Sequence, residues 1–301
     1  MAQTLETLTR RTTSMQGIRS VVHTMKTLSV INAAPYEHAA RAIEAYHDTV
    51  LLGLQAVLSR AGPLRLGAAG GASVGATEVM VVFGSDHGLC GNYNDALAAH
   101  VRQRIEAAGA AAMTSVICIG AQQADALADQ GLCVETTFFP PASVDGIGRL
   151  SNLLTQKLED IRARHRPRDV AISLAYFARS EGATQSPVIA SLLPLEAGLL
   201  ADLQARPWTS RSLPHFSMAQ DDLLKALIRE HLFASLFRAA AEALVTENAA
   251  RLALMQQAEQ SVDDRLEGLR SDTRAMRQSE ITTELLDVII GFEALNRKRT
   301  G

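Results

Sequence analysis

The chain has 301 residues, which is long for one compact domain and closer to the length of two. Aromatic residues make up only 4% of it, with a single Trp, so a large core built on aromatic side chains is excluded and long paired helices are favoured. The formal net charge of −3 excludes a generally basic nucleic-acid binder, although a local basic patch is compatible with it.

The cysteines and the amino terminus bear on the compartment. Cys90, Cys118 and Cys133 are widely spaced, and the first residues carry no apolar signal core. This combination indicates a reducing, cytosolic compartment with free thiols, and we expect Cys118 and Cys133 to be small core residues on separate strands. The longest uncharged run, residues 107–124, contains Gly, Thr, Ser and Gln and is a poor membrane span. We therefore expect no direct membrane insertion.

The first sixty residues carry a helical pattern. Their apolar residues step by three and four along the chain, as at Met15, Ile18, Val22 and Met25. The pattern resumes after Pro35, which is expected to kink the helix or interrupt one turn. We predict a long helix over residues 1–60, and a helix stop followed by a flexible linker over residues 60–71, where Gly is frequent.

The centre of the chain alternates short apolar stretches with helical ones. Strands are expected at residues 78–84, 115–120, 132–138, 169–176 and 186–193, and helices at 94–108, 122–130 and 148–164. Short apolar strands that alternate with helices are typical of a mainly parallel, Rossmann-like sheet. We assign this α/β domain to residues 75–195.

Residues 213–299 form a second long helical pattern. One apolar series steps by four and three through Val262, Leu266, Leu269, Thr273 and Met276, and a second does so through Ile281, Leu285, Val288, Phe292 and Leu295. The second series is displaced by two positions, which indicates either overwinding or a point where the helix leaves its partner. A helix of this length does not bury its stripe alone. We therefore predict an antiparallel coiled coil with residues 1–60 and an inserted α/β domain.

Two segments are candidates for nucleotide binding. Residues 67–75 are rich in Gly, but they precede a strand and lack the Lys-Ser/Thr pair of a phosphate loop, so a linker is favoured. Residues 84–91 follow the first strand and open a helix. Their spacing is not GxGxxG, and no acidic residue ends the second strand to bind a ribose. A dinucleotide site is therefore disfavoured, and we assign no cofactor.

The turn after the first strand also holds residues that carry chemistry elsewhere. His87 and Cys90 could be a nucleophile pair oriented by Asp86, or two ligands of a metal that would need two more. A turn with an exposed histidine explains these residues with fewer assumptions, and we assign no metal. The structural turn then consists of Asp86, Gly88, Leu89, Cys90 and Gly91. A small Rossmann-like hydrolase using Asp86, His87 and Cys90, and a plain coiled-coil scaffold, are the alternative functions.

Three separated segments carry a family resemblance. Residues 85–94 read S-D-H-G-L-C-G-N-Y-N, residues 246–255 read T-E-N-A-A-R-L-A-L-M, and residues 277–285 read R-Q-S-E-I-T-T-E-L. They resemble, in this order, the S-D-x-G-L-C-G-x-x-N turn and the S-E-x-x-A-R-x-x-A-M and R-Q-x-x-I-T-x-E-L helices of the gamma subunit of F-type ATP synthases. Residues 24–26 stand where that family has its K-A-M segment. The order of helix, Rossmann-like domain and long helix also agrees.

The chain departs from the family pattern in two places. Residues 28–35 read L-S-V-I-N-A-A-P, where the family usually has a basic run of the type V-A-A-S-K-L-R. Arg274 stands where an Asn is common. With these changes the chain looks like the divergent second F-type ATPase that some bacteria and archaea carry, often proposed to move Na⁺.

The resemblance implies a non-catalytic rotor shaft on the axis of the alpha–beta hexamer. Such a shaft couples ion flow through the membrane ring of c subunits to ATP synthesis or hydrolysis. It also implies the epsilon subunit as a partner, and a peripheral position on the cytoplasmic face of the bacterial inner membrane. The family's contacts with the catalytic subunits correspond here to Arg277, Gln278, Thr282 and Glu284, with Met25 nearby on the other helix.

Overall fold

A computed structural model describes residues 4–61, 77–109, 114–165, 170–179, 185–208, 211–212 and 215–299. The Gly-rich residues 67–75 lie outside this described part, as does most of the linker expected at residues 60–71. The helices are α1 (Leu5–Ala61), α2 (Tyr93–Ala107), α3 (Ala121–Asp129), α4 (Val144–His165), α5 (Ala197–Ala205) and α6 (Gln220–Arg299). The strands are β1 (Thr77–Phe83), β2 (Thr114–Ile119), β3 (Val134–Phe138), β4 (Val170–Arg179) and β5 (Gln185–Leu193).

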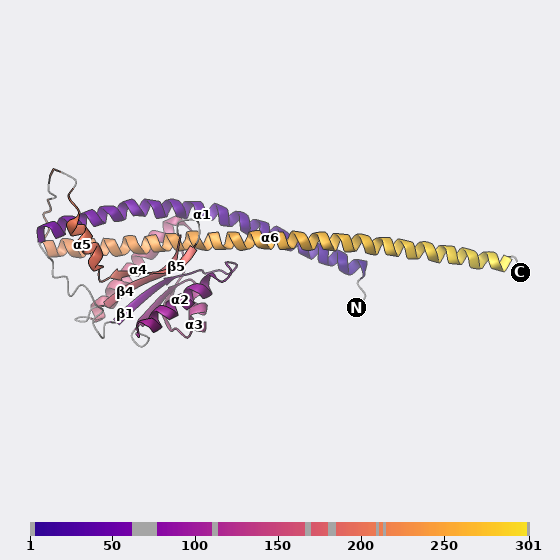
Figure 1. Cartoon of the computed structure of the whole chain (residues 1–301), viewed down its shortest axis with the longest axis horizontal. Coiled ribbons are helices and arrows are strands. Elements are labelled where there is room, and N and C mark those ends of the chain that lie inside the picture. The colour runs from indigo at the N-terminus through magenta and orange to yellow at the C-terminus, as the bar shows by residue number, and fades with distance from the viewer. Residues whose placement is uncertain are drawn as a thin grey trace. The chain divides into compact units, whose positions relative to one another are not determined.

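The chain divides into two compact units. One consists of residues 1–28 and 252–301, and the other of residues 29–251. Both long helices, α1 and α6, contribute to each unit and run antiparallel within it (Figure 1). The expected fold class, paired terminal helices with an inserted Rossmann-like α/β domain, is confirmed.

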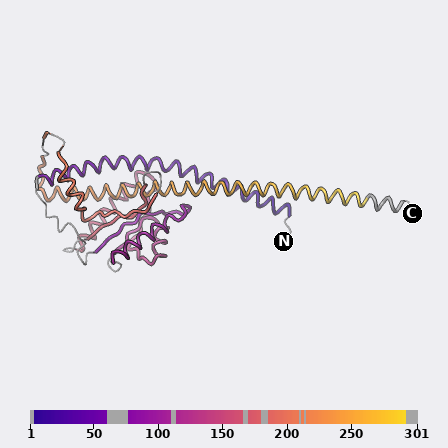
Figure 2. Tube along the Cα trace, viewed as in Figure 1, coloured from indigo at the N-terminus to yellow at the C-terminus, as the bar shows by residue number. Residues whose placement is uncertain are grey.

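The unit of residues 29–251 contains a five-stranded sheet in the order β3-β2-β1-β4-β5. Within this unit the trace of the chain runs through α1 and α6 alongside the sheet (Figure 2). The pairs β1–β2, β2–β3 and β1–β4 are parallel, which confirms the mainly parallel sheet. The edge strand β5 is antiparallel to β4, which the strand pattern does not reveal. Only residues 180–184 separate these two strands, and a connection that short cannot make the crossover that a parallel pair needs.

The two faces of this sheet are covered differently. Along β1, Val79, Val81 and Phe83 point into a core shared with α4 and with parts of α1 and α6. Met80 and Val82 alternate with them and point to the opposite face, where α2 and α3 supply the second core. This alternation is the period of two of a strand buried on both sides. The long helices are therefore part of the domain's own core.

In the unit of residues 1–28 and 252–301, α1 and α6 pair through an apolar seam and a row of ion pairs. Val22 on α1 and Val262 and Leu266 on α6 are buried. Beside the seam, Nε of Arg19 lies 2.5 Å from Oδ1 of Asp263, and Nζ of Lys26 lies 2.5 Å from Oε2 of Glu259. Arg19 precedes Lys26 on α1, whereas its partner Asp263 follows Glu259 on α6. The two helices are therefore antiparallel.

Several local expectations require correction. Pro35 lies inside α1, which continues on both sides of it without an interruption. A proline at this point removes one backbone N–H from the helix, and the rest of the helix is supported by its packing. Cys118 is buried in β2 as expected, but Cys133 is exposed and precedes β3.

The second long helix begins at Gln220, several residues after the start expected at residue 213. The sequence also does not reveal α5, because nine residues are too few to show a period. Leu203 of α5 is buried in a cluster with Leu54 and Val57 of α1 and Leu224 of α6. Tertiary packing of this kind stabilises a helix that would be marginal in isolation.

Candidate functional site

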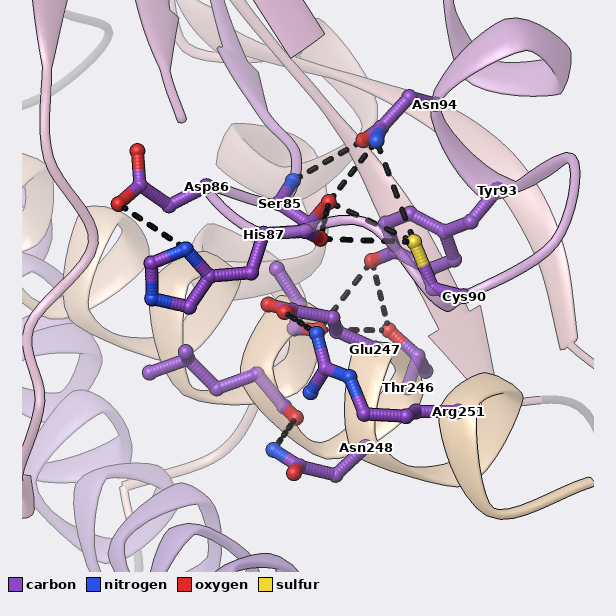
Figure 3. A network of polar contacts seen from close by, with 12 residues as sticks. Ser85, Asp86, His87, Cys90, Tyr93, Asn94, Thr246, Glu247, Asn248 and Arg251 are labelled. Atoms are coloured by element: carbon purple, nitrogen blue, oxygen red, sulfur yellow. Dashed lines mark hydrogen bonds and ion pairs between the residues drawn. The ribbon is translucent and has the colours of Figure 1, made fainter. Parts of the chain in front are cut away.

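The turn after β1 is closed by its own polar side chains (Figure 3). The Asn94 side chain at the start of α2 accepts a hydrogen bond from the backbone N–H of Ser85 at 3.0 Å and donates one to Oγ of Ser85 at 2.8 Å. Ser85 in turn donates to the carbonyl oxygen of His87 at 2.9 Å. Both Ser85 and Asn94 are buried, so these bonds satisfy groups that water does not reach.

The backbone of this turn takes a left-handed conformation at Leu89, with φ of 67°, and at Gly91, with φ of 68°. Glycines in strand-to-helix turns often have a positive φ, which predicts that Gly88 and Gly91 tolerate substitution less well if either has one. Gly91 does, but the second left-handed residue is Leu89 and not Gly88. A non-glycine residue in this region is strained, and the surrounding hydrogen bonds hold it there. The side chain of Leu89 is exposed.

The residues of the alternative hydrolase are not arranged for catalysis. Cys90 is buried with its Sγ 3.5 Å from Oγ of Ser85, and burial raises the pKa of the Cys90 thiol, the opposite of what a nucleophile needs. The His87 side chain is 86% exposed, and its Nδ1 lies 3.7 Å from Asp86. Oδ1 of Asp86 accepts a hydrogen bond from the backbone N–H of Ala121 at 3.1 Å, at the start of α3. Asp86 therefore ties the turn to a neighbouring helix.

The other side of the turn meets α6 (Figure 3). The hydroxyl of the buried Tyr93 lies 3.2 Å from the carbonyl oxygen of Ala243 and 3.1 Å from Oγ1 of Thr246. Thr246 also lies 3.3 Å from the carbonyl oxygen of Phe177 near the end of β4. The rings of Tyr93 and Phe177 stack at a centroid distance of 4.4 Å. Strand, turn and long helix are thus joined at one point, which we call the turn–helix joint.

The turn–helix joint occupies the place where a Rossmann-like sheet usually binds its ligand. In such sheets the ligand crevice opens where two neighbouring strands connect in opposite directions. Here β2 lies on one side of β1 and β4 on the other, so the crevice would open beyond the carboxyl ends of β1 and β4. Here Thr246 of α6 contacts the end of β4, and Glu242 accepts hydrogen bonds from the backbone N–H and Nε of Arg179 at 3.0 and 2.9 Å. The helix α6 therefore lies against the carboxyl end of β4, beside the point where such a crevice would open.

A buried ion pair completes the joint. Nη2 of Arg251 donates to Oε1 of Glu247 at 2.5 Å, one turn apart on α6. Glu247 is only 7% exposed. Burial raises the pKa of the Glu247 carboxyl, and Arg251 opposes that rise. Since a buried carboxylate is costly without a partner, Arg251 offsets part of the cost of burying Glu247 beside the turn.

Sequence reasoning singles out the segments 85–94 and 246–255 separately, but not that they touch. Tyr93 lies within the first segment but is not itself predicted to contact another part of the chain, and Glu242 and Arg179 are missed altogether. Within one sequence the only signal that links the two segments is that both resemble motifs of the same family.

The residues expected to contact catalytic subunits lie in the other unit. Gln278, Thr282 and Glu284 are exposed on α6. Arg277 is also exposed, and it lines a groove of about 1390 Å³ between the start of α1 and α6. Thr9, Thr13, Arg270 and Arg274 also line this groove.

The structure does not bring Met25 close to Arg277. The adjacent Lys26 binds Glu259, which precedes Arg277 by 18 positions on α6 and is therefore about 27 Å from it along the helix. Met25 itself is half-buried. The expected contact residues thus form two separate places on the paired helices, one at Met25 and one from Arg277 to Glu284.

The displacement of the apolar stripe marks the point where α6 leaves α1. Leu266 in the first series is 3% exposed, whereas Ile281, Leu285 and Val288 in the second are 52%, 59% and 69% exposed. The pair of Arg19 with Asp263 fixes how the two antiparallel helices are aligned. Along that alignment, Leu5, the first residue of α1, lies opposite Arg277. Within the described part of the chain, nothing covers the apolar side chains of residues 281–290.

Comparison with known proteins places these features in a family. The family model described as ATP synthase matches residues 4–295, so the chain belongs to the ATP synthase family. The ATP synthase gamma chain of Granulibacter bethesdensis is 26% identical over 303 residues, covering 97% of this chain and 99% of that protein. The gamma chain of Allorhizobium ampelinum is 26% identical over 304 residues with the same coverage. Within that family, the relatives and the three motifs alike mark the gamma subunit of F-type ATP synthases.

A solved structure shares the fold. A chain of the Euglena gracilis mitochondrial ATP synthase, from its OSCP/F1/c-ring in rotational state 3, matches with a TM-score of 0.64 at 14% identity. The match covers 99% of this chain and 96% of that one. Among the residues that the structure describes, no helix is apolar over a length that would cross a bilayer.

Proposed function

We propose that this chain is the central rotor shaft of a membrane-bound F-type ATP synthase or ATPase. It would couple ion flow through a ring of c subunits to ATP synthesis or hydrolysis in an alpha–beta hexamer. Its membership of the ATP synthase family over nearly its whole length carries this proposal. The bare apolar end of α6 supports it, because a large exposed apolar surface on one element is typical of a site for partner proteins.

In this role the chain is not itself catalytic. The helix α6 lies against the carboxyl end of β4, beside the usual ligand position of such a sheet, and Cys90 is buried with a raised pKa; both support a mechanical role over the hydrolase alternative. An asymmetric shaft would contact three catalytic sites in three different ways. Each contact would shift the conformational equilibrium of one site, so that the sites hold different states at one time.

Contacts with the catalytic subunits are assigned to Arg277, Gln278, Thr282 and Glu284, with Met25 as a second, separate contact. These residues of α6 lie where it leaves α1, so a surrounding subunit can reach them without displacing α1. The planar guanidinium of Arg277 can donate two hydrogen bonds to one carboxylate or to backbone carbonyls, which a lysine cannot reproduce.

The α/β domain, assigned to residues 75–195, is proposed to carry the epsilon subunit and to rest on the membrane ring. The shaft helices would then be residues 1–60 and 213–299. The complex would lie on the cytoplasmic face of a bacterial inner membrane, with this chain peripheral to it. The coupling ion would be chosen in the membrane ring. The departures at residues 28–35 and Arg274 favour the divergent second type of F-type ATPase.

The turn–helix joint has a mechanical role in this proposal. Torque generated at the end of α6 must reach the α/β domain without slippage between helix and sheet. Buried hydrogen bonds of Tyr93 with Ala243 and Thr246, and of Thr246 with the carbonyl oxygen of Phe177, fix the helix to the turn and the sheet at one level. A joint of well-packed and satisfied groups resists deformation because interiors are close-packed.

Purification of the chain with its partners tests the proposal. A tagged chain is purified from its native cells, and the co-purified proteins are identified by mass spectrometry. We expect alpha, beta, epsilon and c subunits in the purified material. A second arm deletes residues 75–193, which we expect to release the hexamer from membranes while leaving its ATP hydrolysis in place. Isolation of the chain alone with its own hydrolase activity, or retained ion-coupled attachment after the deletion, would contradict the assignment.

A further inference from the structure

A pair of histidines joins the two long helices within the unit of residues 29–251. Nε2 of His47 on α1 lies 3.1 Å from Nδ1 of His231 on α6. The ring centroids are 5.1 Å apart and the rings are tilted by 34°. His231 is 6% exposed, and His47 is half-buried. At this distance one ring donates its N–H and the other must accept, which requires that at least the accepting ring is neutral.

Several charged and titratable groups surround this pair. Some lie beside His47, and the others are bound to partners of their own. Burial and, to a smaller extent, Arg238 of α6 lower the pKa of His47, and Asp48 on α1 opposes this shift only in part. Glu230 of α6 accepts a hydrogen bond from the hydroxyl of Tyr46 at 2.5 Å. On neighbouring elements, Tyr176 of β4 interacts with Arg238, and Glu159 of α4 binds Arg229 at 3.0 Å. Among the described residues, no carboxylate forms an ion pair with His231.

We propose that His47 and His231 form an acid-sensitive contact that loosens α1 from α6 when both rings become protonated. Two imidazolium rings have no acceptor between them, so the hydrogen bond is replaced by a like-charge contact in a largely dry interface. A rotor shaft depends on its two helices staying together. The pair therefore makes the pairing of the helices sensitive to the acidity of the surrounding solution, a property that does not follow from the rotor role.

The direction of the effect follows from the two pKa values. Burial and the neighbouring His47 lower the pKa of His231 from 6.5 to about 4. Between these values the unfolded chain binds a proton that the folded chain does not. The stability from this group is therefore fully present above its unfolded pKa and is lost as the pH falls toward its folded pKa.

The test compares the full-length chain with its His231→Gln and His38→Gln variants. Gln keeps a neutral polar group beside His47, and His38 is an exposed histidine on the same helix. Urea unfolding is followed at about pH 7.5 and at about pH 5. In the wild type, this pair is expected to raise the equilibrium constant of unfolding roughly tenfold or more at the lower pH, and we call this rise the gain. His231→Gln is expected to remove that gain, and His38→Gln to retain it. An equal pH response in the wild type and His231→Gln overturns the proposal.

Hydrogen–deuterium exchange provides a second measurement that does not depend on global unfolding. After correction for intrinsic exchange rates, amides around His47 in α1 are expected to exchange faster at the lower pH in the wild type and in His38→Gln. In His231→Gln they are expected to change little. Faster exchange of the same size in all three proteins would mean that acid loosens α1 by another route and would reject the histidine contact. Rotor function is measured separately, so a failure of this proposal leaves the rotor assignment intact.

Discussion

The hydroxyl of Tyr93 lies 3.2 Å from the carbonyl oxygen of Ala243, across 150 positions of sequence. This single contact links the first residue of α2 to the interior of α6. Ala243 is buried, as is Tyr93, whose ring stacks on Phe177 of β4. The α/β domain therefore contacts the long helix through a satisfied polar group within an apolar environment.

Removal of this hydroxyl is expected to weaken the joint without disrupting its packing. Tyr93→Phe keeps the ring on Phe177 but removes a hydrogen bond to Ala243 or Thr246, which is expected to cost about 1–2 kcal/mol of unfolding free energy. Urea unfolding of the purified chain measures the change. Tyr46→Phe, at a more exposed hydroxyl on α1, is the control and is expected to cost less. Equal stability of Tyr93→Phe and the wild type would show that the joint does not depend on this bond.

Breaking the buried ion pair is expected to cost more than breaking an exposed one. Arg251→Met leaves the Glu247 carboxylate buried without a cation, which is expected to cost about 3–5 kcal/mol near neutral pH. At lower pH the loss is expected to shrink, because the pKa of Glu247 is already raised and its carboxyl can take up a proton.

Two further variants serve as controls for this ion pair. The double variant Glu247→Gln with Arg251→Met is expected to recover most of the stability. Arg102→Met removes the exposed pair of Arg102 with Glu106 on α2 and an exposed hydrogen bond to the carbonyl oxygen of Gln130, and is expected to cost no more than about 1 kcal/mol. Similar losses for Arg102→Met and Arg251→Met in chemical unfolding would argue against a buried role for Arg251.

The two glycines of the turn are expected to differ in their tolerance of a side chain. Gly91 has a φ of 68°, so Gly91→Ala is expected to cost about 1–2 kcal/mol through backbone strain. Gly88 does not have a positive φ, and a Cβ added there meets no atom within 4 Å. Gly88→Ala is therefore expected to be nearly neutral. Thermal unfolding of both variants compares them directly, and the reverse ranking would refute the assigned turn geometry.

Cys90 and His87 are expected to be dispensable for ATP turnover. In the assembled complex, Cys90→Ser and His87→Ala are each expected to leave the rate of ATP hydrolysis within about twofold of the wild type, because the thiol is buried and the imidazole is exposed. Assembly is checked by size-exclusion chromatography. A complex that assembles normally but has lost hydrolysis would revive the hydrolase alternative.

The contact assigned to Arg277 and Gln278 is expected to affect rotation without affecting assembly. The double variant Arg277→Ala with Gln278→Ala is expected to slow ATP hydrolysis by the reconstituted complex about threefold to tenfold. Each substitution removes a contact that the shaft makes with a catalytic subunit at one rotor angle. The matched control is Arg265→Ala with Gln260→Ala, which removes the same residue types from exposed positions of α6 beside α1. Circular dichroism checks that helicity is retained. Equal rates in the two double variants would locate the contact elsewhere.

The local sequence pattern determines much of this fold. Apolar residues with helical spacing predict the long terminal helices, and short apolar runs predict the strands of the sheet. The displacement after Met276 also marks a real feature, because the stripe is buried up to Leu266 and bare at Ile281. These features can be predicted from the sequence because secondary structure and burial depend on the periodicity of neighbouring side chains.

Only the tertiary structure decided which of these elements meet at the turn–helix joint. The sequence does not reveal that β5 runs antiparallel to β4, that Leu89 takes the left-handed conformation, or that α6 lies against the carboxyl end of β4. Periodicity states which face of an element is buried, but not which residue lies opposite it. Tyr93 and Ala243 meet only because the sheet, α2 and α6 pack together, and that packing depends on the whole chain.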